Sequence, residues 1–390
     1  MLIYYPVFSD ARELTSHFFR AAWYLPAVDG VSRRVVMPAA EGLTVGECPE
    51  AMAEPRPQAG SHIEVLNGPS EATLNGLLSE AEAVFLWKPV SEATRRRLAE
   101  GGAQLFDVAT DDLAGTEYGT YCGALWKCTP ERDQADVLRR SHEAFRRIAA
   151  ATWAKGYDKA VVFGTGPSID KAETFDFSSC FTHVCNTIVQ DRDLIDHIDP
   201  DMISAGDVVS HFGVSAYAGR FRDDLRAVMR ERDCAFLTTA QFGYLLWVHE
   251  PELRDRILLC DQGPAMPNFD LLSNWQLPGL DSVLNIHMLP TAATLFNEVF
   301  VLGCDGQNPD PSKNEDFWQH SARSQYHDLV DSGHRCHPTF AKHRERATWR
   351  RFQNSVKLSL DVGEAYFGKS FTSLAPSFTP GLAEREGAFG

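Results

Sequence analysis

The sequence has few basic residues relative to acidic ones. Its 37 Lys and Arg residues stand against 53 Asp and Glu residues, which gives a formal net charge of −16. Binding of nucleic acid over a broad surface needs an excess of basic side chains against the phosphates, so no nucleic-acid partner is expected. A single local pocket for a small anionic ligand remains compatible with this balance.

Long hydrophobic runs are also missing. No segment approaches the roughly 18 apolar residues of a membrane-spanning helix, so no transmembrane segment is expected. Residues 1–19 lack the basic stretch, the long apolar stretch and the small-residue cleavage site of a signal peptide. We therefore expect a cytoplasmic protein, for which peripheral attachment to the inner membrane stays open. The sequence does not indicate the oligomeric state.

The nine cysteines are scattered, odd in number and without a CxxC pair. In a cytosolic chain this predicts reduced, mostly buried thiols. The hydrophobic fraction of 44% excludes disorder as the dominant state, and 28 Gly and 21 Pro without a period exclude collagen-like chains.

Apolar runs alternate with amphipathic helical patterns along the whole chain, which predicts an α/β protein with mainly parallel sheets. In the first part, strands are expected at 2–7, 34–37, 64–66, 83–87 and 104–108, and helices at 11–27, 70–81 and 91–100. In the second part, strands are expected at 159–163, 181–185, 202–205, 235–239, 256–260 and 299–304. Helices there are expected at 131–155, 219–231, 241–248 and 339–360.

This alternation predicts two Rossmann-like domains. The first covers residues 1–150 and the second residues 151–370, with the boundary within or just after the helix at 131–155. Residues 371–390 are expected to form a loose tail.

Polar or glycine-rich residues follow four strands of the second domain. They are the turn Gly164–Ser168, Asn186, Asp207 and the pair Asp305-Gly306. Ligands of open α/β sheets bind at the carboxyl ends of the strands, so these residues are expected to converge on one crevice.

The turn Gly164-Thr165-Gly166-Pro167-Ser168 lies between a strand and an expected helix. Its glycines allow the backbone to approach a phosphate, Pro167 suits the first helical turn, and Ser168 can cap or donate a hydroxyl. The alternative is a plain tight turn. The turn is not a Walker A loop, because no GK[ST] follows, and it lacks the third glycine of the dinucleotide fingerprint.

The order VFGTGPS, HVCN, a strand closing on Asp207, and FVLGCDG resembles the bacterial sialyltransferases of glycosyltransferase family 42. It equally resembles a wider GxGPS group that includes archaeal pterin pyrophosphokinases. The resemblance covers roughly residues 158–345.

That resemblance implies a Rossmann-like domain that binds a CMP-activated sugar. Gly164, Thr165, Gly166 and Ser168 would approach the donor, Asn186 would hydrogen-bond it, and Asp207 would lie near the sugar. Asp305 would bind the ribose. Two departures are Thr165, where the family commonly has Asn, and Asp207, where it has Asn or another polar group. The helix before GCDG, at about 291–297, looks short. The first 150 residues have no counterpart in the small sialyltransferases and suggest a GT-B-like arrangement with the acceptor between the domains.

Five histidines lie within 24 residues: His320, His327, His334, His337 and His343. Three interpretations stay open: a metal site, a solvated surface helix, or an active-site loop with a general base. The spacing is not that of HExxH, and the nearest cysteine is Cys336.

The active-site interpretation suits the chemistry, because an acceptor hydroxyl must lose a proton and histidine titrates near neutrality. By its resemblance in spacing from Asp305, His337 is the expected base. Tyr326 and His320 are expected to contact phosphate. Arg335 is a candidate for neutralising the leaving nucleotide, its alternative being a solvated surface residue.

Two further patterns concern acids. Asp207 and His211 are four residues apart and would share a face on a helix, which makes His211 a second candidate base, a sugar contact or a structural histidine. Asp207 is itself a candidate catalytic nucleophile or base, so both a retaining and an inverting reaction stay open. Asp191-Arg192-Asp193 matches the metal-binding DxD pattern, but first-turn acids also stabilise helices. We favour the helix interpretation and expect neither an essential metal nor a cofactor.

The expected function is a metal-independent glycosyltransferase of bacterial surface polysaccharide (capsule or lipopolysaccharide) synthesis. Its partners would be a nucleotide-sugar donor and a carbohydrate or lipid-linked glycan acceptor. Two alternatives remain: a pterin-type pyrophosphokinase that uses ATP and Mg²⁺, and a non-catalytic nucleotide-binding module.

Overall fold

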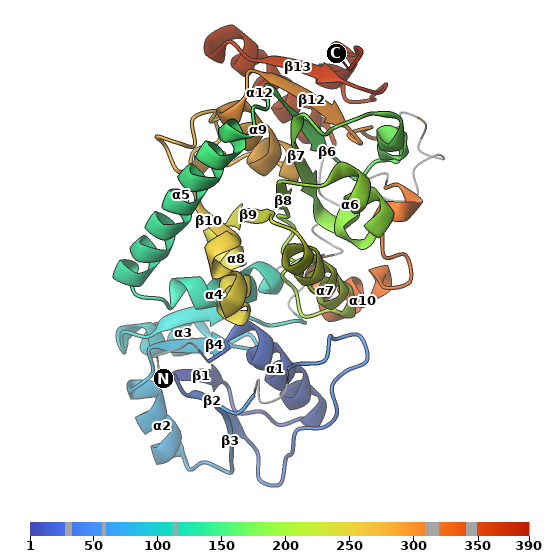
Figure 1. Ribbon diagram of the computed structural model, residues 1–390. Helices are drawn as coiled ribbons and strands as arrows, with labels where there is room; N and C mark the ends of the chain where they lie inside the picture. The colour runs from blue at the N-terminus through green and yellow to red at the C-terminus, as the bar shows by residue number, and fades with distance from the viewer. Residues whose placement is uncertain are drawn as a thin grey trace.

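The computed structural model of the protein describes residues 1–27, 33–56, 60–111, 116–308, 310, 320–340 and 349–389, with the side chains of 349 and 350 left aside. It contains two mainly parallel β-sheets, one of five strands and one of eight. The predicted α/β class with two Rossmann-like units is therefore confirmed. Figure 1 shows the two sheets at opposite ends of the molecule, with helices between them.

The first sheet has the order β3-β2-β1-β4-β5, which is that of a doubly-wound sheet. Its strands are β1 (Leu2–Tyr5), β2 (Val35–Ala39), β3 (Ile63–Asn67), β4 (Ala83–Leu86) and β5 (Gln104–Asp107). Its helices are α1 (Ala11–Tyr24), α2 (Glu71–Ser79) and α3 (Glu92–Glu100).

Both faces of the first sheet are covered because its central strands are apolar throughout. Ile3 and Val36 pack into one cluster and Leu2 and Val35 into another, as the alternation of side chains along a strand requires. Helix α1 begins at Asp10, whose carboxylate accepts two backbone N–H groups of the first turn.

The second sheet has the order β11-β10-β9-β8-β7-β6-β12-β13. Its strands are β6 (Lys159–Phe163), β7 (Cys180–Cys185), β8 (Met202–Ser204), β9 (Ala235–Thr239), β10 (Ile257–Gln262), β11 (Gln276–Leu277), β12 (Glu298–Leu302) and β13 (Ser370–Ser373). The chain runs outward in one direction from β6 to β11 and then returns to the other side of β6. The topological switch point therefore lies between β6 and β12.

The helices around the second sheet fall into α-helices and shorter 3-10 or π segments. The α-helices are α4 (Glu117–Lys127), α5 (Glu131–Ala154), α6 (Arg192–Ile198), α7 (Ala216–Glu231), α8 (Ala240–His249), α9 (Leu289–Leu295), α10 (Val330–Cys336), α12 (Trp349–Phe367) and α13 (Pro380–Ala383). The others are η1 (Pro167–Thr174), η2 (Asn186–Gln190), η3 (Pro251–Arg256), η4 (Leu284–Met288) and η6 (Ala322–Ser324).

Helices α4 and α5 pack on the second sheet and its helices, which differs from the expected boundary near residue 150. α4 packs against α8, and α5 packs against β10. The Ser141 hydroxyl of α5 accepts the backbone N–H of Leu259 at 3.0 Å. The first sheet thus ends at β5, and the change of unit falls between β5 and α4 (Figure 1).

The expectation of a loose tail after residue 370 is wrong. Strand β13 pairs in parallel with β12 and extends the sheet, and Leu382 of α13 is fully buried. Apolar residues of this short segment, such as Phe371 and Leu374, fill the edge of the core. The tail was expected because this segment is rich in Pro, Gly and Ser, which are typical of irregular structure.

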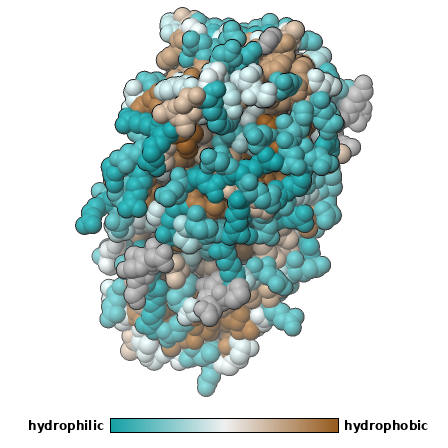
Figure 2. All heavy atoms as spheres, viewed as in Figure 1, coloured by the Kyte–Doolittle hydropathy of each residue, from teal (hydrophilic) through white to brown (hydrophobic). Residues whose placement is uncertain are grey.

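All nine cysteines are free thiols and six of them are buried. This agrees with the prediction of unpaired, mostly buried thiols. Within the described ranges no helix has the length and apolar character needed to cross a bilayer. Figure 2 shows a mostly hydrophilic face with hydrophobic residues at several places, one of them at the end that holds the first sheet.

Candidate functional site

A cavity of about 330 Å³ lies at the carboxyl ends of the strands around the switch point of the second sheet. Loops that follow β6, β7, β8 and β12 meet there, as predicted for a ligand crevice. Its wall consists of Gly164, Thr165, Gly166, Cys185, Asn186, Gly206, Asp207, Ser282, Val283, Leu284, Ile286, Met288, Gly303, Cys304, Asp305, Gly306, His320 and Phe352. We call this cavity the crevice.

The glycine turn after β6 is locked against the loop after β12. Gly164 donates to the Leu302 carbonyl at 2.8 Å, and Gly166 donates to the Gly303 carbonyl at 2.7 Å. A Cβ on Gly164 would lie 2.4 Å from the Gly303 oxygen, and Gly303 has a φ of +74°. The two loops touch backbone to backbone, so side chains cannot be accommodated at these positions.

Asp305 occupies the beginning of η1, where an anionic ligand was expected. Its carboxylate accepts the Ser168 backbone N–H at 3.1 Å and the Ser168 hydroxyl at 2.9 Å. Burial raises the pKa of this carboxyl. Because one donor cannot serve two anions, Ser168 is not available to a donor phosphate, and neither Pro167 nor Ser168 lines the crevice. Thr165 and the glycines do line it.

Asn186 follows β7 in the left-handed region, with a φ of +52°. Asparagine tolerates this conformation better than most residues. Its side-chain oxygen is buried and accepts no hydrogen bond from the described part of the chain. A buried acceptor without a donor is costly, so this amide is suited to a ligand donor.

Asp207 lies in a turn after β8 rather than on a helix. One carboxylate oxygen accepts the backbone N–H groups of Val209 at 2.9 Å and Ser210 at 2.6 Å, a typical Asx turn. The Asp207 backbone N–H donates to Nδ1 of His211 at 3.2 Å. His211 is buried behind the turn, does not line the crevice, and has its pKa lowered to about 4 by that burial.

His320 is the one member of the histidine-rich segment found in the crevice wall among the described residues. Its Nδ1 lies 2.9 Å from the Thr165 hydroxyl. The next residue, Ser321, donates its backbone N–H to the Thr165 carbonyl at 2.7 Å and its hydroxyl to Asp170 at 2.7 Å. These contacts fasten the segment to the glycine turn.

His337, the expected base, lies outside the crevice wall and is fully buried where the first unit meets α4 and α10. Its Nδ1 is 3.1 Å from a carboxylate oxygen of Glu117, and its Nε2 is 3.4 Å from the Tyr24 hydroxyl. The Thr339 hydroxyl donates to the same carboxylate. Burial lowers the pKa of His337. Both ring nitrogens thus face protein groups, which fits a structural histidine.

Two other residues expected at the phosphate also lie elsewhere. The Tyr326 hydroxyl donates to Asp224 at 2.7 Å, and its ring packs edge-on against Tyr217. Arg335 is exposed and pairs with Asp331 at 3.0 Å. Local acids satisfy both side chains, and neither lines the crevice.

The DxD segment forms the start of a helix, as favoured from the sequence. Asp191 caps α6 by accepting the Leu194 backbone N–H at 3.1 Å, and it pairs with Arg323. Of the five histidines, His343 lies outside the described residues. Within the described ranges no group of three or more His, Cys, Asp or Glu side chains is arranged to hold a metal ion.

Sequence reasoning missed the apolar wall of the crevice. It comes from π-helix η4 and from Ser282 and Val283 before it; Ser282 has a φ of +73°. Because η4 continues into α9, the helix before GCDG runs from Leu284 to Leu295 and is longer than expected. Four of the seven residues in the string SVLNIHM are apolar, but no periodicity distinguishes a π-helix from an α-helix. π-helical turns are frequent at functional sites.

No family model, curated protein or solved structure matches the chain.

Proposed function

We propose that the protein is a glycosyltransferase that uses a CMP-activated acidic sugar and acts in bacterial surface polysaccharide synthesis. The observation that carries the proposal is the convergence of the glycine turn, Asn186, Asp207 and His320 in one crevice at the switch point of the second sheet. This is the place where α/β sheets of this topology bind nucleotides.

The charge of the crevice favours a donor with a single phosphate. Among the described residues, its wall contains no lysine or arginine, whereas Asp207 and Asp305 both contribute carboxylates. A diphosphate or triphosphate carries more negative charge and needs cations or a metal ion to balance it. A CMP-sugar carries only one charge on its phosphate, so the wall of the crevice has less charge to balance at that point.

In the proposed reaction, His320 acts as the general base. With Nδ1–H donating to the Thr165 hydroxyl, Nε2 carries the lone pair that a base requires. The acceptor hydroxyl loses its proton to Nε2 as its oxygen bonds to the anomeric carbon. The bond between that carbon and the phosphate oxygen breaks, and CMP leaves. Asp207 would orient the sugar.

The side of the crevice toward the first unit would receive the acceptor. Tyr118 of α4 does not line the crevice but lies beside His337, and burial together with the charges of Glu117 and Asp207 raises its pKa to about 12. Its phenol is therefore a stable hydrogen-bond donor to a carbohydrate or lipid-linked glycan. A cytoplasmic enzyme attached peripherally to the inner membrane would meet such acceptors.

The test is turnover of CMP–sialic acid in the presence of EDTA, measured as CMP released per enzyme. The wild type should release CMP, and His320→Gln should release far less while it still binds CMP. Equal release of CMP by both proteins would show that His320 is not the general base. Absence of release with any CMP-sugar, or turnover only of ATP with Mg²⁺, would overturn the proposed function.

A further inference from the structure

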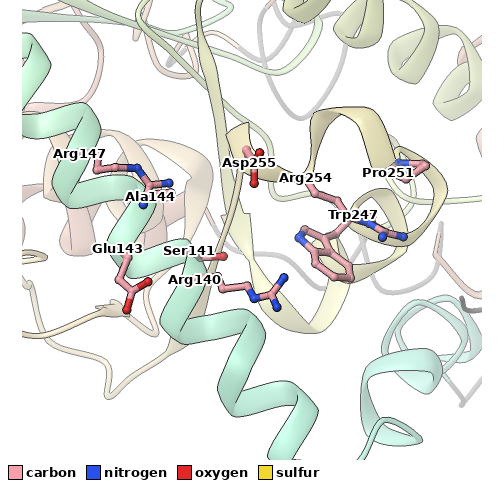
Figure 3. Close-up of a pocket in the computed structure, with 9 residues that line it drawn as sticks. All are labelled: Arg140, Ser141, Glu143, Ala144, Arg147, Trp247, Pro251, Arg254 and Asp255. Atoms are coloured by element: carbon pink, nitrogen blue, oxygen red, sulfur yellow. The ribbon is translucent and has the colours of Figure 1, made fainter. Parts of the chain in front are cut away.

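A second cavity, of about 270 Å³, lies between α5 and the segment from α8 to η3. Its wall consists of Arg140, Ser141, Glu143, Ala144, Arg147, Trp247, Pro251, Arg254 and Asp255. We call it the arginine pocket (Figure 3). Arg254 and Asp255 lie near the end of η3, which leads into the amino end of β10, whereas the crevice lies at the carboxyl ends of the strands. The two cavities are therefore separate.

Hydrogen-bond donors predominate in this pocket. Figure 3 shows Arg140 and Arg147 extending from α5 toward the side where Trp247 and Asp255 lie. Arg147 forms no hydrogen bond or ion pair with the part of the chain that the structure describes, and no described residue accepts from the indole N–H of Trp247. Arg140 engages Asp136 through Nε at 2.8 Å, which leaves its terminal nitrogens directed elsewhere.

The indole is held rigidly in place. The Arg254 guanidinium lies 4.3 Å from the centre of the Trp247 ring, and Tyr244 stacks with the same ring at 5.6 Å. Arg254 is itself fixed by donating Nε–H to the Trp247 carbonyl at 2.8 Å. The indole N–H therefore keeps one direction, and a preorganised donor loses little entropy on binding.

The local charge differs from that of the whole molecule. Glu143 is paired with Arg139 at 2.8 Å, so Asp255 is the one wall carboxylate without an ion pair among the described residues. On a chain of net charge −16, two guanidinium groups directed into one cavity mark a site for an anion. Buried Ala144, with Trp247 and Pro251, gives the pocket an apolar side as well.

We propose that the arginine pocket binds an organic phosphomonoester. The phosphate would accept hydrogen bonds from Arg140, Arg147 and the Trp247 indole, since guanidinium forks match phosphate oxygens. The apolar side would contact the organic part of the ligand. Asp255 weakens binding by repulsion and so sets the affinity at a moderate level.

The probes are inorganic phosphate, phenyl phosphate and benzoate, titrated calorimetrically into the full chain at constant ionic strength. Phenyl phosphate should bind more tightly than inorganic phosphate, and benzoate more weakly than either. Arg147→Gln should weaken phenyl phosphate binding by about tenfold or more, the usual effect of losing a charge-assisted hydrogen bond. Trp247→Phe should weaken it by a smaller factor, and Asp255→Asn should strengthen it.

Arg132→Gln is the matched control, because Arg132 is exposed on the first turn of α5 and outside the pocket. It should leave the affinity unchanged. Equal binding by Arg147→Gln and the wild type would overturn the proposal, as would no binding of either phosphate or a preference for benzoate. Asp255→Asn guards against a folding artefact, since a misfolded protein would not gain affinity.

Discussion

Asp305 and Ser168 join the two loops that build the crevice. The carboxylate of Asp305, after β12, accepts both the backbone N–H and the hydroxyl of Ser168, after β6. The same hydroxyl accepts the Gly303 backbone N–H at 3.1 Å. These bonds close the glycine turn from both sides and leave Thr165 and Asn186, rather than the beginning of η1, to meet a ligand.

The close approach at the glycine turn predicts a steep cost for any side chain there. A Cβ on Gly166 would lie 2.3 Å from a carboxylate oxygen of Asp305. Gly166→Ala should lower the free energy of unfolding by about 1–3 kcal/mol, the usual cost of overpacking. The control is Gly76→Ala on α2, where a Cβ meets nothing within 4 Å. It should raise stability by up to about 1 kcal/mol. Denaturant unfolding measures the free energy of unfolding of both variants. Equal changes in the two would contradict the close contact at the glycine turn.

His320 and the exposed His327 form a matched pair for testing the proposed base. His320→Gln should lower kcat by about 10²–10⁴-fold, the range that a positioned acid or base contributes. CMP affinity and the melting temperature should stay near the wild-type values. His327→Gln should change none of these quantities. A loss of kcat in both variants would show that the effect is not specific to the crevice.

His337 should contribute to stability and not to ligand binding. His337→Ala leaves the carboxylate of Glu117 buried without its imidazole partner, and Glu117 is 1% exposed. We expect a loss of about 3 kcal/mol, as for broken buried pairs. His337→Gln, which keeps a donor, should lose less. Calorimetric titration should give wild-type CMP affinity for both. If these variants instead kept wild-type stability and lost turnover, His337 would be the general base.

Buried histidines predict a loss of stability in mild acid. Burial lowers the pKa of His183, His249 and His287 to about 3 and that of His211 to about 4. Each group takes up its proton near pH 6.5 when unfolded but only at much lower pH when folded. The stability that each contributes is full above pH 6.5 and is lost as pH falls, by about 1.4 kcal/mol per pH unit and histidine. Urea unfolding between pH 7 and 4.5 should show this slope.

The contribution of a single histidine to this pH dependence can be measured at His287. Both of its ring nitrogens are buried without partners in the described part of the chain. His287→Leu should therefore raise the free energy of unfolding by about 1 kcal/mol at pH 7 and by more at pH 5, because an unsatisfied buried polar group is removed. A destabilised variant would mean that the imidazole has a partner.

The sequence predicted the sheets and the position of the crevice well. Buried strands such as β6 and β12 carry continuous apolar runs, and the residues after them are polar or glycine, so Thr165, Asn186, Asp207 and Asp305 could be placed together. These signals are local, and the switch-point rule converts them into a site.

Long-range partners could not be predicted in the same way. Nothing in the local sequence shows that Glu117 lies beside His337 or that Asp224 lies beside Tyr326, because 220 and 102 residues separate the partners. Histidine spacing likewise did not reveal that His320 alone among the described members of its segment lines the crevice. The π-helix η4 could not be predicted either, because no sequence periodicity distinguishes a π-helix from an α-helix.

Binding of CMP in EDTA would distinguish a metal-independent CMP-sugar transferase from a Mg²⁺-dependent enzyme that uses ATP. The melting temperature would be measured with CMP, UDP, ADP and ATP, each with EDTA and with Mg²⁺. A ligand at about 100 times its Kd stabilises by about 2.7 kcal/mol, which is readily measured as a shift of a few degrees. CMP in EDTA should give a larger shift than the diphosphates or ATP. A shift only with ATP and Mg²⁺, or none with any nucleotide, would contradict the proposed function.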